Sequence, residues 1–253
     1  MTKPTYFYGK LMPQFRHLTL LPFFKRQKIL AFSPHADDIS IAAGGFLGQL
    51  AKINTVIPVL GYTGWCGVDS GLSKNEAILL REKEITHEAR ILSFTPPVFL
   101  RLSSYDRDCP QNFAKDAEKV KRLIQKEKPD IVFIPDIHDD QPRHKQLTLF
   151  VGKALRSMKN IQIFFYETPW KLFSQGDFNC IIPISPPFFE KKIAAIKAHA
   201  SQLARTDFVR LAKAIASIRA ETVGEQKIGG YGTEKINVGH WVEVFSYKKA
   251  TSV

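Results

Sequence analysis

Two stretches rich in histidine and aspartate each follow a short apolar run of the chain. The first, "PHADD", contains His35, Asp37 and Asp38, and the second, "HDDQPRH", spans residues 138–144. Imidazole and carboxylate groups bind divalent metals, and a site with three protein ligands leaves positions open for water and substrate. We expect His35, Asp38 and a histidine of the second stretch to hold a metal. Asp37 would then be free to take a proton from water that the metal activates.

These residues also have a purely structural interpretation. An aspartate before a helix commonly caps the helix N-terminus, and a histidine in a loop is most often polar surface. For Asp37 and Asp38 alone, the cap is the better interpretation. Two clusters of metal-type ligands, each placed directly after an apolar run, favour the metal site.

The elements that must position these clusters follow from hydrophobic patterning. We predict strands at 29–32, 55–60, 98–102, 131–134 and 161–166, and helices at 40–52, 76–92, 113–126 and 144–158. Such alternation is typical of right-handed βαβ units. It predicts an α/β fold, with a single Rossmann-like domain whose mainly parallel sheet is flanked by helices. Ligands bind such sheets beyond the carboxyl ends of the strands, so the two polar clusters should meet at one edge.

A pair of glycines lies inside the first predicted helix. Gly44 and Gly45 cost helix stability, because glycine loses the most backbone freedom on folding. We therefore expect another element to approach the helix closely at this point.

Composition is that of a globular protein with a large excess of positive charge. The chain has 253 residues, 44% hydrophobic and 24% charged, with three widely spaced cysteines and no apolar run near the ~20 residues of a membrane span. An odd, scattered cysteine count fits reduced thiols, and we expect a cytoplasmic protein. The net charge of +12 should attract anionic ligands.

Much of this positive charge lies before the first predicted strand. We expect residues 1–27 to form a basic, aromatic arm that packs on one domain of residues 28–248. The same alternation of basic and apolar residues leaves a peripheral membrane contact as an alternative.

Further motifs follow the first one in a recognisable order. "PHADD" with its two glycines is followed by "LREKEITHEARIL" (80–92), "YETPW" (166–170), "KIAAIKAHASQ" (192–202) and "VEVF" (242–245). In this order the sequence resembles the LmbE-like or PIG-L superfamily of zinc-dependent de-N-acetylases. Glu88 stands where the corresponding helix of the family has a small residue. His199 is expected to be structural or to support a metal-binding loop.

The resemblance implies roles for the residues of the first two motifs. It implies that His35, Asp38 and His144 bind the metal and that Asp37 is the general base. The expected metal is Zn²⁺, although a mixed histidine and aspartate site also accepts Fe²⁺.

The second motif departs from the family pattern. The family's carbonyl-polarising histidine aligns with Gln141, and its aspartate aligns with Arg143. Gln141 can donate a hydrogen bond but cannot carry a proton, and His138 is the alternative for this role. The resemblance also implies that Arg81 and Asp106 contact the substrate.

The implied reaction is removal of the acetyl group from an N-acetylglucosamine-type glycoconjugate with an anionic part, giving a free amino sugar and acetate. A degenerate member that binds metal and glycan without efficient turnover is the alternative, supported by the changes at Gln141 and Arg143. The sequence contains no zinc-finger spacing, RNP pattern or arginine-rich helix that would support nucleic-acid binding. A nucleotide-binding Rossmann protein would need GxGxxG where "PHADD" stands.

Overall fold

A computed structural model describes residues 6–11, 14–20, 26–68, 71–104, 112–156, 158–224 and 238–249, the first two ranges by their backbone alone. These residues form one sheet of nine strands in the order β2-β1-β8-β9-β7-β6-β3-β4-β5. The parallel strands form one side of the sheet: β7 (Gln162–Tyr166), β6 (Ile131–Pro135), β3 (Lys28–Ser33), β4 (Thr55–Tyr62) and the edge strand β5 (Val98–Leu102). Its antiparallel extension consists of β1 (Tyr6–Leu11), β2 (Gln14–Leu20), β8 (Cys180–Pro183) and β9 (Val242–Lys249). The prediction of a single α/β domain with a mainly parallel sheet is confirmed.

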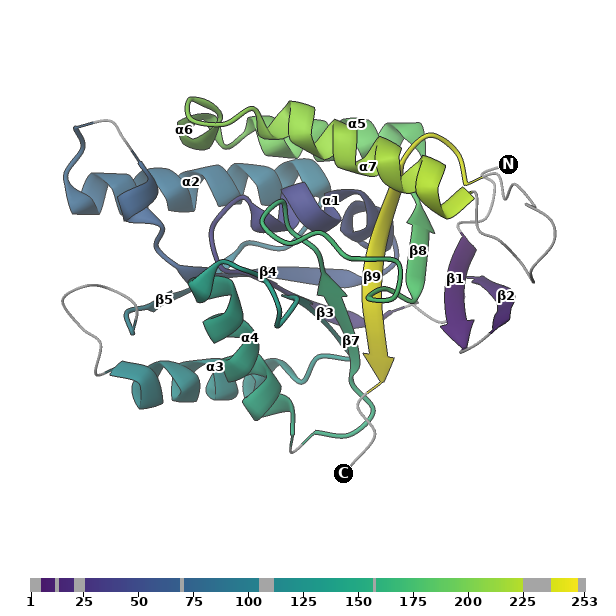
Figure 1. Cartoon of the computed structure of the whole chain (residues 1–253). Coiled ribbons are helices and arrows are strands. Elements are labelled where there is room, and N and C mark those ends of the chain that lie inside the picture. The colour runs from purple at the N-terminus through teal and green to yellow at the C-terminus, as the bar shows by residue number, and fades with distance from the viewer. Residues whose placement is uncertain are drawn as a thin grey trace.

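Helices cover both faces of the sheet (Figure 1). One face carries α1 (Asp38–Leu50), α2 (Lys74–Leu92), α5 (Pro186–Lys197), α6 (Ala200–Leu203) and α7 (Phe208–Gly224). The other face carries α3 (Phe113–Glu127) and α4 (Pro142–Leu155). Separate apolar clusters fill the space beneath each helical layer, so the sheet is buried on both sides as parallel sheets require.

Several helix boundaries differ from the sequence prediction by one to three residues. α4 begins at Pro142, two residues earlier than predicted, because the Gln141 side chain accepts a hydrogen bond from the Arg143 backbone N–H at 2.9 Å and proline suits the first helical position. The motif "KIAAIKAHASQ" (192–202) spans two helices, α5 and α6, because the backbone breaks at His199 (φ −92°, ψ 58°). Helix α7 was not predicted from periodicity.

The N-terminal segment contributes to the sheet. β1 pairs antiparallel with β2 and with β8, so residues 6–20 extend the sheet at one edge. The division of the chain at residue 28 stays a prediction. Among the described residues, no helix combines the length and apolar character that crossing a membrane requires.

The expected close approach at the paired glycines is confirmed. Glu243 of β9 accepts hydrogen bonds from the backbone N–H groups of Gly45 and Phe46 at 2.9 and 2.8 Å, and from Lys192 of α5 at 2.6 Å. Both charged side chains are buried. A Cβ on Gly45 would lie 2.8 Å from the Ile184 side chain and 2.9 Å from Glu243 Oε1. The glycine therefore lets a buried ion pair lock α1 against β9 and α5.

Gly45→Ala is expected to destabilise the protein by about 1–3 kcal/mol, because the added methyl group overpacks this contact. Urea denaturation measures the free energy of unfolding. Gly152→Ala in α4 is the matched control: nothing lies within 4 Å of its Cβ position. That change should stabilise by about 0.5–1 kcal/mol through helix propensity. Equal stabilisation by both changes would contradict the packing argument.

Candidate metal centre and active site

Three donor atoms converge at the carboxyl edge of the parallel strands. His35 follows β3, Asp38 begins α1, and His144 lies in the first turn of α4 after the neighbouring strand β6. The distances are 3.2 Å from His35 Nδ1 to Asp38 Oδ2, 3.3 Å from His144 Nε2 to Asp38 Oδ2, and 3.2 Å between the two nitrogens. Donor atoms about 2.0–2.1 Å from a tetrahedral zinc ion lie about 3.3–3.4 Å apart. The triangle therefore fits one divalent metal, and this group of three is brought together as the sequence predicted.

Charges in this triangle perturb one another. Burial raises the pKa of Asp38, but the charges of His144 and His35 and their hydrogen bonds outweigh it and hold the pKa well below its usual range. Burial lowers the pKa of His144, but the nearby Asp38 and Asp139 carboxylates raise it to about 10. Without a metal, the His144 imidazole is therefore protonated and positively charged at neutral pH. A metal that binds its Nε2 must displace that proton.

Asp139 orients the histidine ligand His144. Its Oδ2 lies 2.9 Å from His144 Nδ1 and accepts a hydrogen bond from Thr168 Oγ1 at 2.6 Å, while Oδ1 accepts from the Gln141 backbone N–H at 2.8 Å. The carboxylate is buried. It fixes the imidazole so that Nε2 faces the other donors, as carboxylates behind metal-binding histidines do. Sequence reasoning placed Asp139 in the polar cluster but assigned it no role.

Asp37 stands beside the triangle and faces a buried arginine. It occupies the N-cap position of α1 but makes no side-chain capping hydrogen bond, so the cap interpretation fails for its carboxylate. Instead, Arg81 Nη2 donates to Asp37 Oδ1 at 2.5 Å, and Arg81 Nη1 donates to Glu84 Oε2 at 2.9 Å. Arg81 is only 1% exposed. The arginine expected to contact substrate therefore also clamps the expected base.

A second layer of buried charge supports Arg81. Glu84 accepts two hydrogen bonds from Ser201, from its backbone N–H and its hydroxyl, both at 2.8 Å. His199 Nε2 lies 2.6 Å from Glu88 Oε2, with both side chains buried. Burial raises the pKa of Glu88, against the hydrogen bond and charge of His199. The unusual glutamate at position 88 is thus the partner of His199, and the pair ties α2 to the break between α5 and α6.

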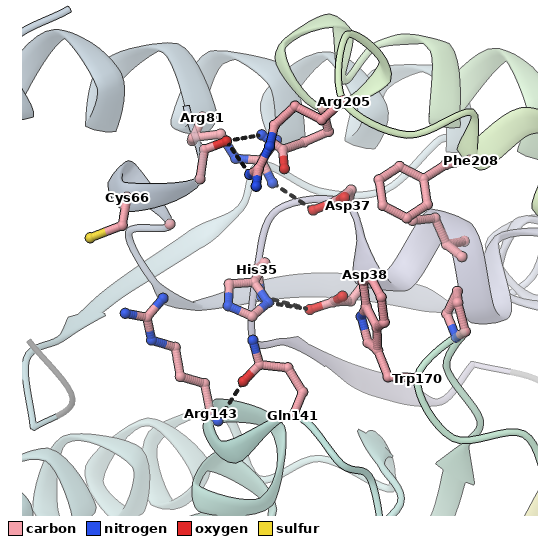
Figure 2. A pocket seen from close by; sticks show the side chains of 15 residues that line it. His35, Asp37, Asp38, Cys66, Arg81, Gln141, Arg143, Trp170, Arg205 and Phe208 are labelled. Atoms are coloured by element: carbon pink, nitrogen blue, oxygen red, sulfur yellow. Dashed lines mark hydrogen bonds and ion pairs between the residues drawn. The ribbon is translucent and has the colours of Figure 1, made fainter. Parts of the chain in front are cut away.

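A cavity of about 310 Å³ lies against His35 and Asp38 of the donor triangle, while His144 is buried behind them. Figure 2 shows His35 and Asp38 at its centre, with Arg81 and Arg205 on one side and Gln141 and Arg143 on the other. The side-chain oxygen Oε1 of Gln141 accepts a hydrogen bond from the Arg143 backbone N–H. The side-chain NH₂ group of Gln141 is therefore directed into the cavity.

The remaining predicted site residues lie elsewhere. His138 is exposed and lines a different pocket, together with Asp136, Lys171 and Lys248. Asp106 lies outside the described residues.

Sequence reasoning missed part of the cavity wall. Trp170, Arg205 and Phe208 line it, and Trp170 is 52% exposed. Of these, only Trp170 belongs to a motif singled out in the sequence, "YETPW". No local pattern pointed to Arg205 or Phe208, because only the fold brings this part of the chain to the cavity.

An α/β sheet with a His-Asp-His donor triangle at its carboxyl edge defines this chain as a candidate metal-binding protein of the Rossmann-like class. Residues 30–155 match the family model PIG-L, described as GlcNAc-PI de-N-acetylase. The chain therefore contains a PIG-L (LmbE-like) domain, and the resemblance inferred from the motifs is confirmed.

Individual relatives agree with this assignment. The chain is 26% identical over 182 residues to the "Uncharacterized deacetylase YaiS" of Escherichia coli K12, covering 70% of this chain and 92% of that protein. N,N'-diacetylchitobiose deacetylase from Pyrococcus horikoshii has a similar structure, with a TM-score of 0.65, 24% identity and coverage of 90% and 85%. A hydratase, GalB of Pseudomonas putida KT2440, shares the fold at a TM-score of 0.66 and 14% identity, covering 87% and 95%. At such identities the solved structures establish the fold alone.

Proposed function

We propose that the protein is a metal-dependent hydrolase that removes the acetyl group from an N-acetylglucosamine-type glycoconjugate, giving a free amino sugar and acetate. The PIG-L domain and the deacetylase relatives support hydrolytic deacetylation. The observation that carries the proposal is the donor triangle of His35, Asp38 and His144, with His35, Asp38 and the neighbouring Asp37 lining one cavity. Zinc is the proposed metal, and Fe²⁺ suits the same mixed donor set.

Each side chain in the cavity has a part in this reaction. A metal held by His35, Asp38 and His144 would polarise the acetamide carbonyl and activate water. Asp37, held in place by Arg81, accepts the proton of the attacking water and passes it to the departing nitrogen. Water and the amide are thereby converted to acetate and an amine.

Gln141 is the proposed donor to the carbonyl oxygen. Its NH₂ group faces the cavity, where it can stabilise the negative charge that develops on that oxygen. His138 lines a separate pocket, so Gln141 is the better candidate of the two. The size of the cavity lies at the lower end of the ~300–1,000 Å³ range of small-molecule pockets, which suits a ligand of about one sugar unit.

Acetate release from a panel of N-acetylated sugars by the zinc-loaded protein tests both the activity and the role of Gln141. Gln141→Ala is expected to lower turnover by about 10²–10³-fold, with metal content intact, because it removes one oxyanion donor. Gln141→His should preserve or raise activity and add an ionisation to the pH profile. His138→Ala is the matched control and should change little.

Two outcomes would count against this assignment. A damaging His138→Ala together with a silent Gln141→Ala would transfer the role to His138. No acetate from any sugar in the panel, whichever divalent metal is supplied, would favour a protein that binds metal and glycan without turnover, the alternative that the replacement at Gln141 supports.

A further inference from the structure

Three buried charged residues lie in a row on one face of α2. Arg81, Glu84 and Glu88 follow one another at helical spacing, and each is at most 5% exposed. Arg81 contacts Asp37 at one end of the row, and Glu88 contacts His199 at the other end. One chain of polar contacts therefore joins the active-site cavity to the break between α5 and α6.

The carboxylate of Glu84, in the middle of the row, is fully engaged. Its Oε1 accepts a hydrogen bond from the Ser201 backbone N–H at 2.8 Å. Its Oε2 accepts from the Ser201 hydroxyl at 2.8 Å and from Arg81 Nη1 at 2.9 Å. A carboxylate oxygen has two lone pairs, so both lone pairs of Oε2 are in use. A third donor at Oε2 would have to displace Arg81 or Ser201.

The imidazole of His199 is placed to be that third donor. Its Nδ1 is buried without a hydrogen-bond partner among the described residues, and Glu84 Oε2 lies 3.9 Å away, beyond hydrogen-bond reach. Its Nε2 lies 2.6 Å from Glu88 Oε2. A neutral imidazole carries one N–H, and the bond made by one nitrogen decides the role of the other. A hydrogen bond from Nε2–H to Glu88 therefore leaves Nδ1 without a proton to donate to Glu84.

Stability does not account for a glutamate at position 88. Burial of a charged or strongly polar pair costs hydration, and an apolar pair of similar volume is often equally or more stable. Both Glu88 and His199 are buried, and the motif that this helix resembles has a small residue at position 88. What Glu88 adds to the contacts of α2 is an acceptor for His199 Nε2.

We propose that Glu88 is a positioning residue for the base of the hydrolysis. By accepting the Nε2–H of His199, it prevents Nδ1 from donating to Glu84. Glu84 then keeps its hydrogen bond with Arg81, and Arg81 holds Asp37 beside the metal donors. This inference rests on the proposed function for the role of Asp37.

The tautomer of His199 tests the proposal without any turnover. NMR of isotope-labelled histidine side chains in the zinc-loaded full chain reports which ring nitrogen carries the proton, and His199→Leu identifies the signal by its absence. We expect the proton on Nε2 in the wild type and on Nδ1 in Glu88→Leu, which removes the acceptor and keeps a side chain of similar size. The same tautomer in both proteins would overturn the proposal.

Turnover separates positioning from a purely structural contact. Glu88→Leu should lower kcat for acetate release by about 10–100-fold, with metal content and KM little changed, because a displaced base slows the reaction without weakening sugar binding. Adding His199→Leu to Glu88→Leu should recover most of this loss, since no imidazole remains to compete for Glu84. Glu82→Leu is the matched control: it removes another buried glutamate of α2, the partner of Arg101, and should leave kcat unchanged.

The other outcomes distinguish this inference from the proposed hydrolysis. A double variant as slow as Glu88→Leu would overturn the positioning role, and so would a switched tautomer with unchanged turnover, while the hydrolase would stand. If the wild type releases no acetate, the hydrolase is rejected, and a crystal structure of Glu88→Leu decides the proposal. Loss of the hydrogen bond between Arg81 and Glu84 in that structure would support it, and retention of the bond would overturn it.

Discussion

Asp37→Asn is expected to lower turnover by about 10²–10⁴-fold while leaving metal content unchanged, because it removes the general base and none of the three metal donors. The asparagine keeps an oxygen that can accept the hydrogen bond of Arg81, so the geometry of the cavity is retained. Acetate release and elemental analysis on the same preparation provide the two measurements. A free energy of unfolding measured alongside them detects any cost of leaving Arg81 with one carboxylate fewer.

The adjacent Asp38→Asn is the matched comparison. Asp38 Oδ2 faces both histidine donors, so this change should weaken metal binding itself, and activity should fall in step with metal content. Excess zinc would restore part of the activity of Asp38→Asn and none of that of Asp37→Asn. The reverse pattern, with metal lost from Asp37→Asn and retained in Asp38→Asn, would mean that the two roles are exchanged.

His144→Ala is expected to remove nearly all bound metal, since it deletes one corner of the donor triangle. Asp139→Asn should leave a weaker site, with metal affinity about 10–100-fold lower, because the imidazole loses the carboxylate that orients it. Competition with a chelator measures both affinities. His138→Ala and Asp140→Asn are the matched controls, as both side chains are exposed. Unchanged metal content in His144→Ala would reject the site.

The pH dependence of metal binding follows from the same contacts. The pKa of His144 is raised to about 10 without metal, so this ligand carries a proton at neutral pH that metal binding must release. Apparent metal affinity of the wild type should therefore rise as the pH is raised towards 10. Asp139→Asn removes one of the charges that raise the pKa of His144. In this variant the metal affinity should therefore stop rising at a lower pH. An identical pH profile in the two proteins would count against the role of Asp139.

Much of the fold was predictable because the signals are local. Alternating apolar runs and amphipathic stretches reflect contacts that every parallel sheet and covering helix must make, whatever their order in space. The position of "PHADD" and of His144 just beyond two strands then implied a shared edge. The ends of the helices were less predictable. The early start of α4 depends on the cap at Gln141, and the break at His199 depends on contacts with α2.

By itself the sequence determined the fold class, the two metal-type clusters and the need for close approach at Gly44 and Gly45, since each is written in neighbouring residues. Only the tertiary structure decided how adjacent or similar side chains differ. The different roles expected for Asp37 and Asp38 find a physical basis only here: Arg81 contacts the first, and the two histidines contact the second. Gln141 lines the cavity beside the metal donors, whereas His138, three residues earlier, lines a different pocket. Such contacts join residues far apart in the chain, and strand order, which no local pattern encodes, is what brings them together.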